Sequence, residues 1–491
     1  MTWLFGVLMI MGVGDPAVAE DAPGLAMRAG AIAASLPDEP LKSKMEKDLL
    51  REKVACLLAE CGDIPAARLM SRALWSDYQF SASLVIAVRQ AKKGDRQATA
   101  TAFAEAERLV PGVESSKPDG LRTVLFLSRL ARSQAEAGLT TEAGGTWRRA
   151  FELLATVQPD PLRGGNTGIR RLPLQQIAID QALAGDEEAA ARLVRTSPLL
   201  EARERQDIMT AVFSAVASDL TDRGELRRAL AVSRRIGSPI RRAESCQRIA
   251  ASGLRESSKP EARDAALASA HAANEVRDRY AKTSLLAKAA RLLVQAGDRE
   301  EAEATLARAV AQSSDREPSA AYRLAWAGQA IELAVARQLL GKPDALKSLR
   351  QAEEVAARGD EPTHCALISG DIGVAKARMG DVDGALANLK SLIGSVPVAE
   401  RVLEAAIWNR AARDDLDGAI RVIDAARAEP DFARTIGDLV ETVAYSKAKS
   451  GDGRWTLAWT ERQSSPTARA RALIGAARGK LARRDGQAGV R

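Results

Sequence analysis

Apolar positions recur at helical spacing in short, paired segments along most of the chain. One clear case is the stretch 285–309. Its first predicted helix places Ala290 and Leu293 on the apolar side, and its second places Ala302, Leu306 and Ala309 there. Gly297 ends the first helix, because glycine adopts a left-handed conformation at little cost, and Asp298 is a good cap for the second. The stretch predicts a helix hairpin.

The same pattern recurs around further turns. Two good copies centre on Gly138, with Ala131, Ala143, Trp147 and Ala150, and on Gly380, with Gly373, Ala385, Leu389 and Leu392. Looser copies centre on Gly62, Gly94, Gly185, Gly224, Gly341, Asp414 and Gly451. The residue seven before these looser turns is small, as in Ala55, Ala87, Ala178, Ala217, Ala334 and Ala444, with Ile407 the one large exception. A repeated helix hairpin therefore organises the chain.

These columns resemble the tetratricopeptide repeat family. In that family a small residue in the first helix, a turn Gly, and small, aromatic and Ala positions in the second helix form the signature, with a closing Pro. Pro111 and Pro397 stand where the closing Pro belongs. The signature Trp and Tyr of the first helix are missing, being replaced by Leu127, Leu174 and Leu286 and by Gln134, Gln181 and Lys376. The spacing between turns scatters, for example 32 residues from Gly62 to Gly94 and 47 from Gly138 to Gly185, whereas a strict array holds near 34.

The resemblance implies an all-α, right-handed superhelix of about ten to eleven hairpins. We expect a signal peptide over 1–19, a linker over 20–43 with a short helix near 25–34, repeats over 44–484 and a tail over 485–491. Stretches rich in Pro, Gly or Ser, expected to separate repeats, lie at 111–119, 158–173, 256–260, 313–318 and 359–362.

Composition limits which side chains can pack the core of such a fold and which partners it can bind. The chain is 46% hydrophobic but only 4% aromatic, so packing must rest on Ala, Leu and Val. The net charge of +7 (71 basic, 64 acidic) is spread through the helices with both signs mixed, which is typical of a solvated face. No concentrated basic face with stacking aromatics is present, and nucleic acid is not an expected partner.

The N-terminal residues predict export. An apolar run from Trp3 to Val13 is followed by the small-residue pattern Ala17-Val18-Ala19, which resembles a secretory signal peptide cleaved after Ala19. No Lys or Arg precedes the run, so a retained membrane anchor or a misassigned start are the alternatives. No other apolar segment approaches the length of a membrane span, and we expect a periplasmic or secreted mature chain.

Candidate chemistry is sparse, and we predict no catalytic residue, cofactor or metal. The four cysteines, Cys56, Cys61, Cys246 and Cys365, are interpreted as small packed residues, because Cys56 and Cys61 on one helix point apart. His271 and His364 lie in no nucleophile motif, and no zinc spacing surrounds them. The stretch 163–168, Arg-Gly-Gly-Asn-Thr-Gly, follows no predicted strand and is interpreted as a loop between repeats.

The candidate site comes from position in the repeat. In the tetratricopeptide fold the residue six before the turn faces the concave groove, and the resemblance places there Arg132, Ile179, Arg291, Val335, Val374, Trp408 and Tyr445. These types are common in binding hot spots and would meet a peptide or a helix. The alternative is that Trp408 and Tyr445 pack against the next repeat. Trp455 and Trp459 are predicted to be core residues.

The predicted function is therefore a non-enzymatic scaffold that binds a protein or peptide along its concave face, a prediction that rests on analogy of fold. Two alternatives remain open: an accessory subunit of a cell-envelope enzyme complex, and an RNA-binding helical repeat. The sequence sets no oligomeric state.

Overall fold

The computed structural model describes residues 21–37, 41–110, 120–156, 167–256, 258–313, 322–358, 361–389, 392, 396–427 and 433–488. Within these ranges the regular elements are all helices, and eleven consecutive pairs are each joined by a short turn. The pairs are α3 (Leu41–Cys61) and α4 (Ile64–Ser71), α5 (Ser76–Lys92) and α6 (Arg96–Arg108), α7 (Gly120–Glu136) and α8 (Thr140–Thr156), α9 (Thr167–Leu183) and α10 (Glu187–Thr196), α11 (Ala202–Asp222) and α12 (Leu226–Ser233), α13 (Pro239–Arg255) and α14 (Lys259–Asn274), α15 (Arg279–Ala296) and α16 (Arg299–Gln312), α17 (Arg323–Leu339) and α18 (Ala345–Ala357), α19 (Pro362–Met379) and α20 (Val382–Leu389), α21 (Val396–Ala412) and α22 (Leu416–Arg427), and α23 (Ala433–Ser450) and α24 (Gly453–Glu461). A single helix flanks the pairs at each end, α2 (Ala22–Ser35) and α25 (Pro466–Ala488). The predicted all-α hairpin repeat is confirmed, whereas the signal peptide and the stretch 163–166 lie outside the described residues.

The first helix of each predicted hairpin ends at the predicted turn. All nine turn glycines have positive φ, and Asp414, the predicted turn without a glycine, has φ of 56°. At the organising hairpin, Gly297 has φ of 93° and the Asp298 carboxylate accepts a hydrogen bond from the backbone N–H of Glu301 at 3.2 Å. One short motif therefore stops one helix and starts the next.

One hairpin, α13 with α14, was not predicted. The sequence placed a boundary between repeats at 256–260, but the turn of one pair falls there, between Arg255 at the end of α13 and Lys259 at the start of α14. It has no left-handed glycine; instead Gly253 lies where a Cβ would come within 3.1 Å of the Ala262 backbone nitrogen. The glycine of this hairpin serves close packing of its two helices, so the turn motif did not reveal it.

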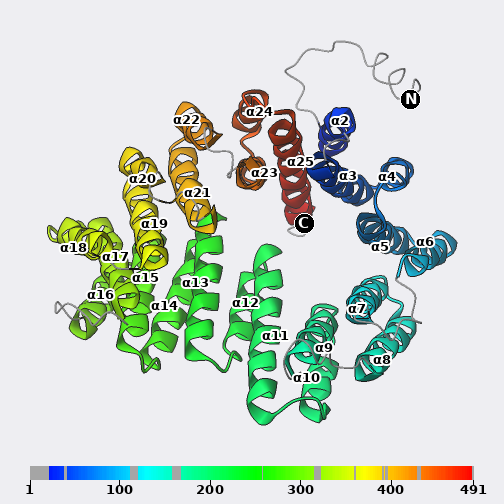
Figure 1. Ribbon diagram of the computed structural model, residues 1–491, viewed down its shortest axis with the longest axis horizontal. Helices are drawn as coiled ribbons and strands as arrows, with labels where there is room; N and C mark the ends of the chain where they lie inside the picture. Colours follow the sequence, from blue (N-terminus) through cyan, green and yellow to red (C-terminus); the bar gives the residue numbers. More distant parts are fainter. Residues whose placement is uncertain are drawn as a thin grey trace. The chain divides into compact units, whose positions relative to one another are not determined.

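The described chain forms two compact units. Unit 2 spans Phe103–Arg413, and unit 1 combines Met1–Ala102 with Asp414–Arg491. In unit 2 the first helices of successive hairpins pack side by side in chain order from α7 to α21 (Figure 1). The second helices from α8 to α20 each pack on the first helix of their own pair. The core between them is built largely of Ala, Leu and Val, as the composition requires.

In unit 1 the two ends of the chain meet. Helix α2 packs against both α25 and α3, and α25 also contacts α3 (Figure 1). The second helix of a hairpin has two neighbours of the same kind. Helix α14, for example, packs on the first helix of its own pair, α13, and on the first helix of the next pair, α15. Helix α2 thus acts as the second helix of a hairpin whose first helix is α25. The expected linker with a short helix over 25–34 instead contains a longer helix with a buried face.

The buried face of α2 is made of small side chains and one leucine. Leu25, Ala26, Ala29, Gly30 and Ala33 are buried, and Asp21 caps the helix by accepting a hydrogen bond from the Gly24 N–H at 2.9 Å. A Cβ at Gly30 would stand 2.9 Å from the Met70 side chain of α4. Small residues therefore let α2 approach its neighbours closely.

Helices α23 and α25 also approach closely, through glycines one turn apart. A Cβ at Gly475 would lie 2.1 Å from the Glu441 carbonyl oxygen, and one at Gly479 would lie 2.3 Å from that of Tyr445. Backbone, which cannot rotate away, occupies the space that a side chain would need. The two helices can pack in this way only with glycine at these positions.

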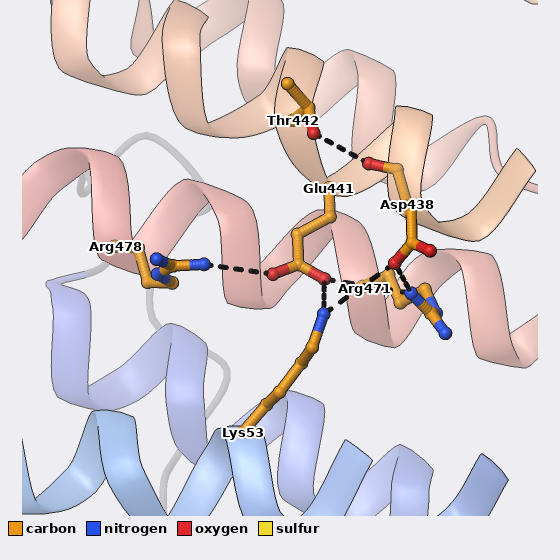
Figure 2. A network of polar contacts seen from close by, with 6 residues as sticks. All are labelled: Lys53, Asp438, Glu441, Thr442, Arg471 and Arg478. Atoms are coloured by element: carbon orange, nitrogen blue, oxygen red, sulfur yellow. Dashed lines mark hydrogen bonds and ion pairs between the residues drawn. The ribbon is translucent and has the colours of Figure 1, made fainter. Parts of the chain in front are cut away.

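A polar network joins α3, α23 and α25 within unit 1 (Figure 2). The Lys53 ammonium donates to Glu441 at 2.5 Å, and Arg478 donates to the other oxygen of that carboxylate at 3.3 Å. Arg471, only 1% exposed, pairs with Asp438 and lies 3.9 Å from Glu441. The buried Glu441 carboxylate therefore has cations from both ends of the chain around it, which offsets its loss of hydration. None of the helices described is long and apolar enough to cross a membrane.

We expect Leu25→Ala to lower the free energy of unfolding by about 2–4 kcal/mol, because it leaves a cavity under α2. Met27 on the same helix is 45% exposed whereas Leu25 is 1% exposed, so Met27→Ala is the matched control and should change stability little. Chemical denaturation monitored by circular dichroism measures both. Equal, small effects would show that α2 is not docked.

Gly475→Ala should lower the free energy of unfolding by about 1–3 kcal/mol, since the added methyl group forces α23 and α25 apart. Gly145 is also helical, but a Cβ added there would meet no neighbouring atom within 4 Å, so Gly145→Ala should be neutral or stabilise by up to about 1 kcal/mol. Thermal melts measure the stability of the two variants. A larger loss of stability in Gly145→Ala than in Gly475→Ala would contradict this packing.

Candidate partner-binding groove

A groove of about 690 Å³ runs across the first helices of four consecutive hairpins in unit 2, α15, α17, α19 and α21, and reaches Gln247 and Arg248 of α13. Four of the seven predicted site residues line it: Arg291, Val335, Val374 and Trp408. The structure thus brings together the central part of the predicted column.

The repeat explains why these positions face the groove. The residue just before each of them is buried, as at Ala290 and Ala334. At Gly373 an added Cβ would come within 3.0 Å of Val402 on α21. A small residue at this position lets neighbouring first helices approach, and the next residue, about 100° further around the helix, then points into the groove.

The floor of the groove is apolar. It is formed by Ile331, Val335 and Leu339 of α17, with Val374 of α19 and Trp408 of α21. Val335 and Val374 are buried, whereas Trp408 is half-buried and offers part of its ring. The surface is therefore continuous with the core, and an apolar side chain of a partner would lose water contact on binding.

Charged side chains line the groove beside this floor. The basic ones are Arg248, Lys288, Arg291, Arg378 and Arg401, and the acidic ones are Glu332, Asp371 and Glu404. Asp371 pairs with Arg401 at 2.8 Å. Burial raises the pKa of Asp371, while Arg401 acts against this shift. One oxygen of Glu332 lies 3.8 Å from Lys288 and 3.7 Å from Arg378.

Arg291 differs from these residues. Among the residues that the structure describes, its guanidinium forms no hydrogen bond or ion pair, and its buried Nε has no acceptor. Burial, together with the neighbouring Arg378, lowers the pKa of Arg291 to about 10, while Glu332 opposes the shift. The side chain is still cationic at neutral pH. A desolvated charge without a partner destabilises a protein, which makes Arg291 a candidate for function.

Two acceptors in the groove are also unpaired within the described chain. They are Glu332 Oε2 and Asn409 Oδ1, both buried. Together with Arg291 Nε, the groove offers one donor and two acceptors from α15, α17 and α21. Buried polar atoms of this kind require a partner from water or a ligand.

Apart from Arg291, the charged groove residues were missed by sequence reasoning, although a signal exists for three of them. Lys288, Glu332 and Asp371 each stand nine residues before their turn, in three successive hairpins. The ninth residue before the turn lies about one helical turn before the sixth, so both columns share a face. A search for charges in this column would have found them.

The other three predicted site residues lie elsewhere. Arg132 of α7 donates to Glu136 at 2.9 Å and lies 3.8 Å from Asp180 of α9 and 4.0 Å from Asp219 of α11. It ties three first helices together. Ile179 packs against the core of unit 2. In unit 1, the Tyr445 ring lies 5.9 Å from the Arg478 guanidinium carbon. Their role in binding stays a prediction.

The remaining candidates for chemistry are structural. Trp455 and Trp459 stack with centroids 5.2 Å apart and are buried, as predicted for core residues. The four cysteines are free thiols, of which Cys246 is buried, and burial raises its pKa. No group of three potential metal-ligating side chains occurs within the described ranges.

Arg291→Met should leave the melting temperature unchanged or raise it, because it removes an unpaired charge and keeps the volume. Arg471→Met, also a replacement of a buried arginine, should lower the free energy of unfolding by about 2 kcal/mol, since it removes a cation from Asp438 and Glu441. Calorimetry of the two variants compares them directly. A strong loss of stability in Arg291→Met would mean that this arginine is structural.

Comparisons with known proteins add little to this description. No family model and no curated protein matches the chain. Among solved structures, Rap protein complexed with competence and sporulation factor is 12% identical, with a TM-score of 0.28, over 79% of this chain and 97% of that chain. A circular tandem repeat protein with novel repeat topology and enhanced subunit contact surfaces is 16% identical, with a TM-score of 0.16, over 95% of this chain and 97% of that chain. At such scores these similarities carry no argument, and the helices themselves identify the chain as an all-α protein of repeated helix hairpins.

Proposed function

We propose that the chain is a non-enzymatic interaction scaffold that binds a protein segment, an extended peptide or a helix, along the groove of unit 2. The observation that carries this proposal is the combination of an apolar floor containing Trp408 with unpaired donors and acceptors from several hairpins. Apolar area supplies affinity and convergent polar groups fix the orientation of a ligand. The groove crosses the first helices of four hairpins, which gives it the length of a short segment rather than of a single small molecule.

A half-buried tryptophan is the best single anchor in this groove, because such residues often dominate binding energy. The partner is recovered by mild crosslinking in the native compartment and identified by mass spectrometry. We expect Trp408→Ala to abolish recovery of the main partner, because the substitution lowers the binding free energy by about 2 kcal/mol or more. Trp75, 37% exposed and in unit 1, provides the matched control Trp75→Ala.

The proposal fails if Trp408→Ala recovers the same proteins as the unchanged chain. If nucleic acid is recovered and nuclease treatment removes the signal, the RNA-binding alternative replaces it. If the recovered partner is an enzyme of the cell envelope whose activity depends on the chain, the accessory-subunit alternative is the more specific one.

We further propose that the scaffold acts after export. The support comes from the apolar run Trp3–Val13 and the Ala17-Val18-Ala19 pattern. The mature chain would then begin at Glu20, directly before the Asp21 cap of α2. N-terminal sequencing of the protein isolated from its native compartment should give Glu20 as the first residue, and a chain still beginning at Met1 would contradict export with cleavage.

A further inference from the structure

Two arginines with desolvated guanidinium groups have opposite surroundings in this protein. Arg471 in unit 1 has Asp438 and Glu441 beside it, so its charge is balanced inside the fold. Arg291 in the groove has no ion pair among the described residues. A role in folding accounts for Arg471 but not for Arg291, because methionine or leucine would fill the space of Arg291 without leaving a charge unpaired.

The nearest carboxylate does not neutralise Arg291. Glu332 directs one oxygen toward Lys288 and Arg378, at 3.8 and 3.7 Å, and forms no ion pair with Arg291. Arg378 is itself close enough to lower the pKa of Arg291. Two guanidinium groups therefore share one neighbouring carboxylate, which leaves positive charge in this part of the groove.

We propose that the groove is selective for a protein segment bearing an acidic side chain, whose carboxylate pairs with Arg291. This inference rests on the proposed function and names the class of partner at the same site. A carboxylate accepts from a guanidinium in a bidentate, charge-assisted arrangement, so it supplies the acceptor that Arg291 Nε lacks. With five basic and three acidic side chains lining the groove, one or two negative charges complement it.

The two unpaired acceptors favour a carboxylate that belongs to a polypeptide over a free anion. Glu332 Oε2 and Asn409 Oδ1 need N–H donors, which a free anion such as acetate does not have. An extended segment provides main-chain N–H groups on both sides of its acidic residue, while its apolar side chains cover the floor around Val335 and Val374. Glu332, Asp371 and Glu404 disfavour a doubly charged phosphate at the same place, because like charges repel.

The test starts from a phage library of random short peptides selected against the immobilised full-length mature chain. Peptides whose binding is lost on Trp408→Ala are kept, synthesised and measured by isothermal titration calorimetry. We expect these peptides to share an Asp or Glu. Replacing it with Asn or Gln should weaken binding at least about 10-fold to the unchanged protein, as charge-assisted hydrogen bonds do.

A double-mutant cycle then assigns the contact. On Arg291→Gln the same change in the peptide should have almost no effect, whereas the control Arg241→Gln should keep the full discrimination, because Arg241 lies on α13, is exposed and pairs with Glu244 at 3.2 Å. Circular dichroism melts of both variants establish that they are folded. Acetate should not compete with the peptide at equal ionic strength.

Each contrary result has a separate meaning. Peptides that depend on Trp408 but have no acidic residue, or whose discrimination survives Arg291→Gln, overturn the carboxylate contact and leave the proposed scaffold standing. A phosphoserine in place of the acidic residue that binds tighter than Glu overturns the choice of carboxylate over phosphate. If no selected peptide depends on Trp408, the groove is not the binding surface, and both proposals fail.

Discussion

Close approach of helix backbones is the constraint on which the rest of this structure depends. With few aromatic residues available, the hairpins pack through Ala and Gly, and the small residue seven before each turn is the clearest example. Dispersion contacts between backbones brought this close replace the contacts that large side chains would make. The same spacing shapes the groove of unit 2, because the next residue along α15, α17, α19 and α21 faces it.

The polar groups of the molecule divide according to whether the fold completes their interactions. Arg132 and Arg471 link helices from several hairpins and are balanced by carboxylates. Buried polar atoms without a hydrogen-bond partner occur at several places in the described chain, Arg471 Nε among them, but Arg291, Glu332 and Asn409 bring three such atoms to one groove. Natural proteins keep such imperfections where a ligand completes them, so the unpaired atoms say more about binding than the size of the groove does.

Much of the fold could be predicted from the sequence, because the turn motif is local. Gly297 and its counterparts carry conformational information within a few residues, and every predicted turn was found. The α13–α14 hairpin was missed because its glycine, Gly253, serves contact between helices and not a left-handed turn. The docking of α2 was missed for a different reason: an Ala-rich helix after a predicted signal peptide gives no indication that its partner lies at the other end of the chain.

The site was predicted in part for a similar reason. The column that contains Arg291 and Trp408 follows from the repeat, but whether a charged side chain in that column is already paired depends on neighbouring helices. Arg132 and Arg291 occupy equivalent positions in their hairpins, yet only Arg132 meets carboxylates from the following first helices. No pattern within one repeat distinguishes these two arginines.

The contact between α2 and α25 has a consequence for how the protein is made. Synthesis proceeds from the N-terminus, so α2 appears before the other helices described, while α25 begins at Pro466, more than 400 residues later. Hairpins in between can fold as they emerge, because their contacts are local. Helix α2 can pack on α3 as soon as that helix emerges, but the part of its buried face that α25 covers stays exposed until nearly the whole chain has been made. Helix α25 therefore completes the burial of α2, and a chain truncated before α25 would leave one side of α2 exposed to chaperones and proteases.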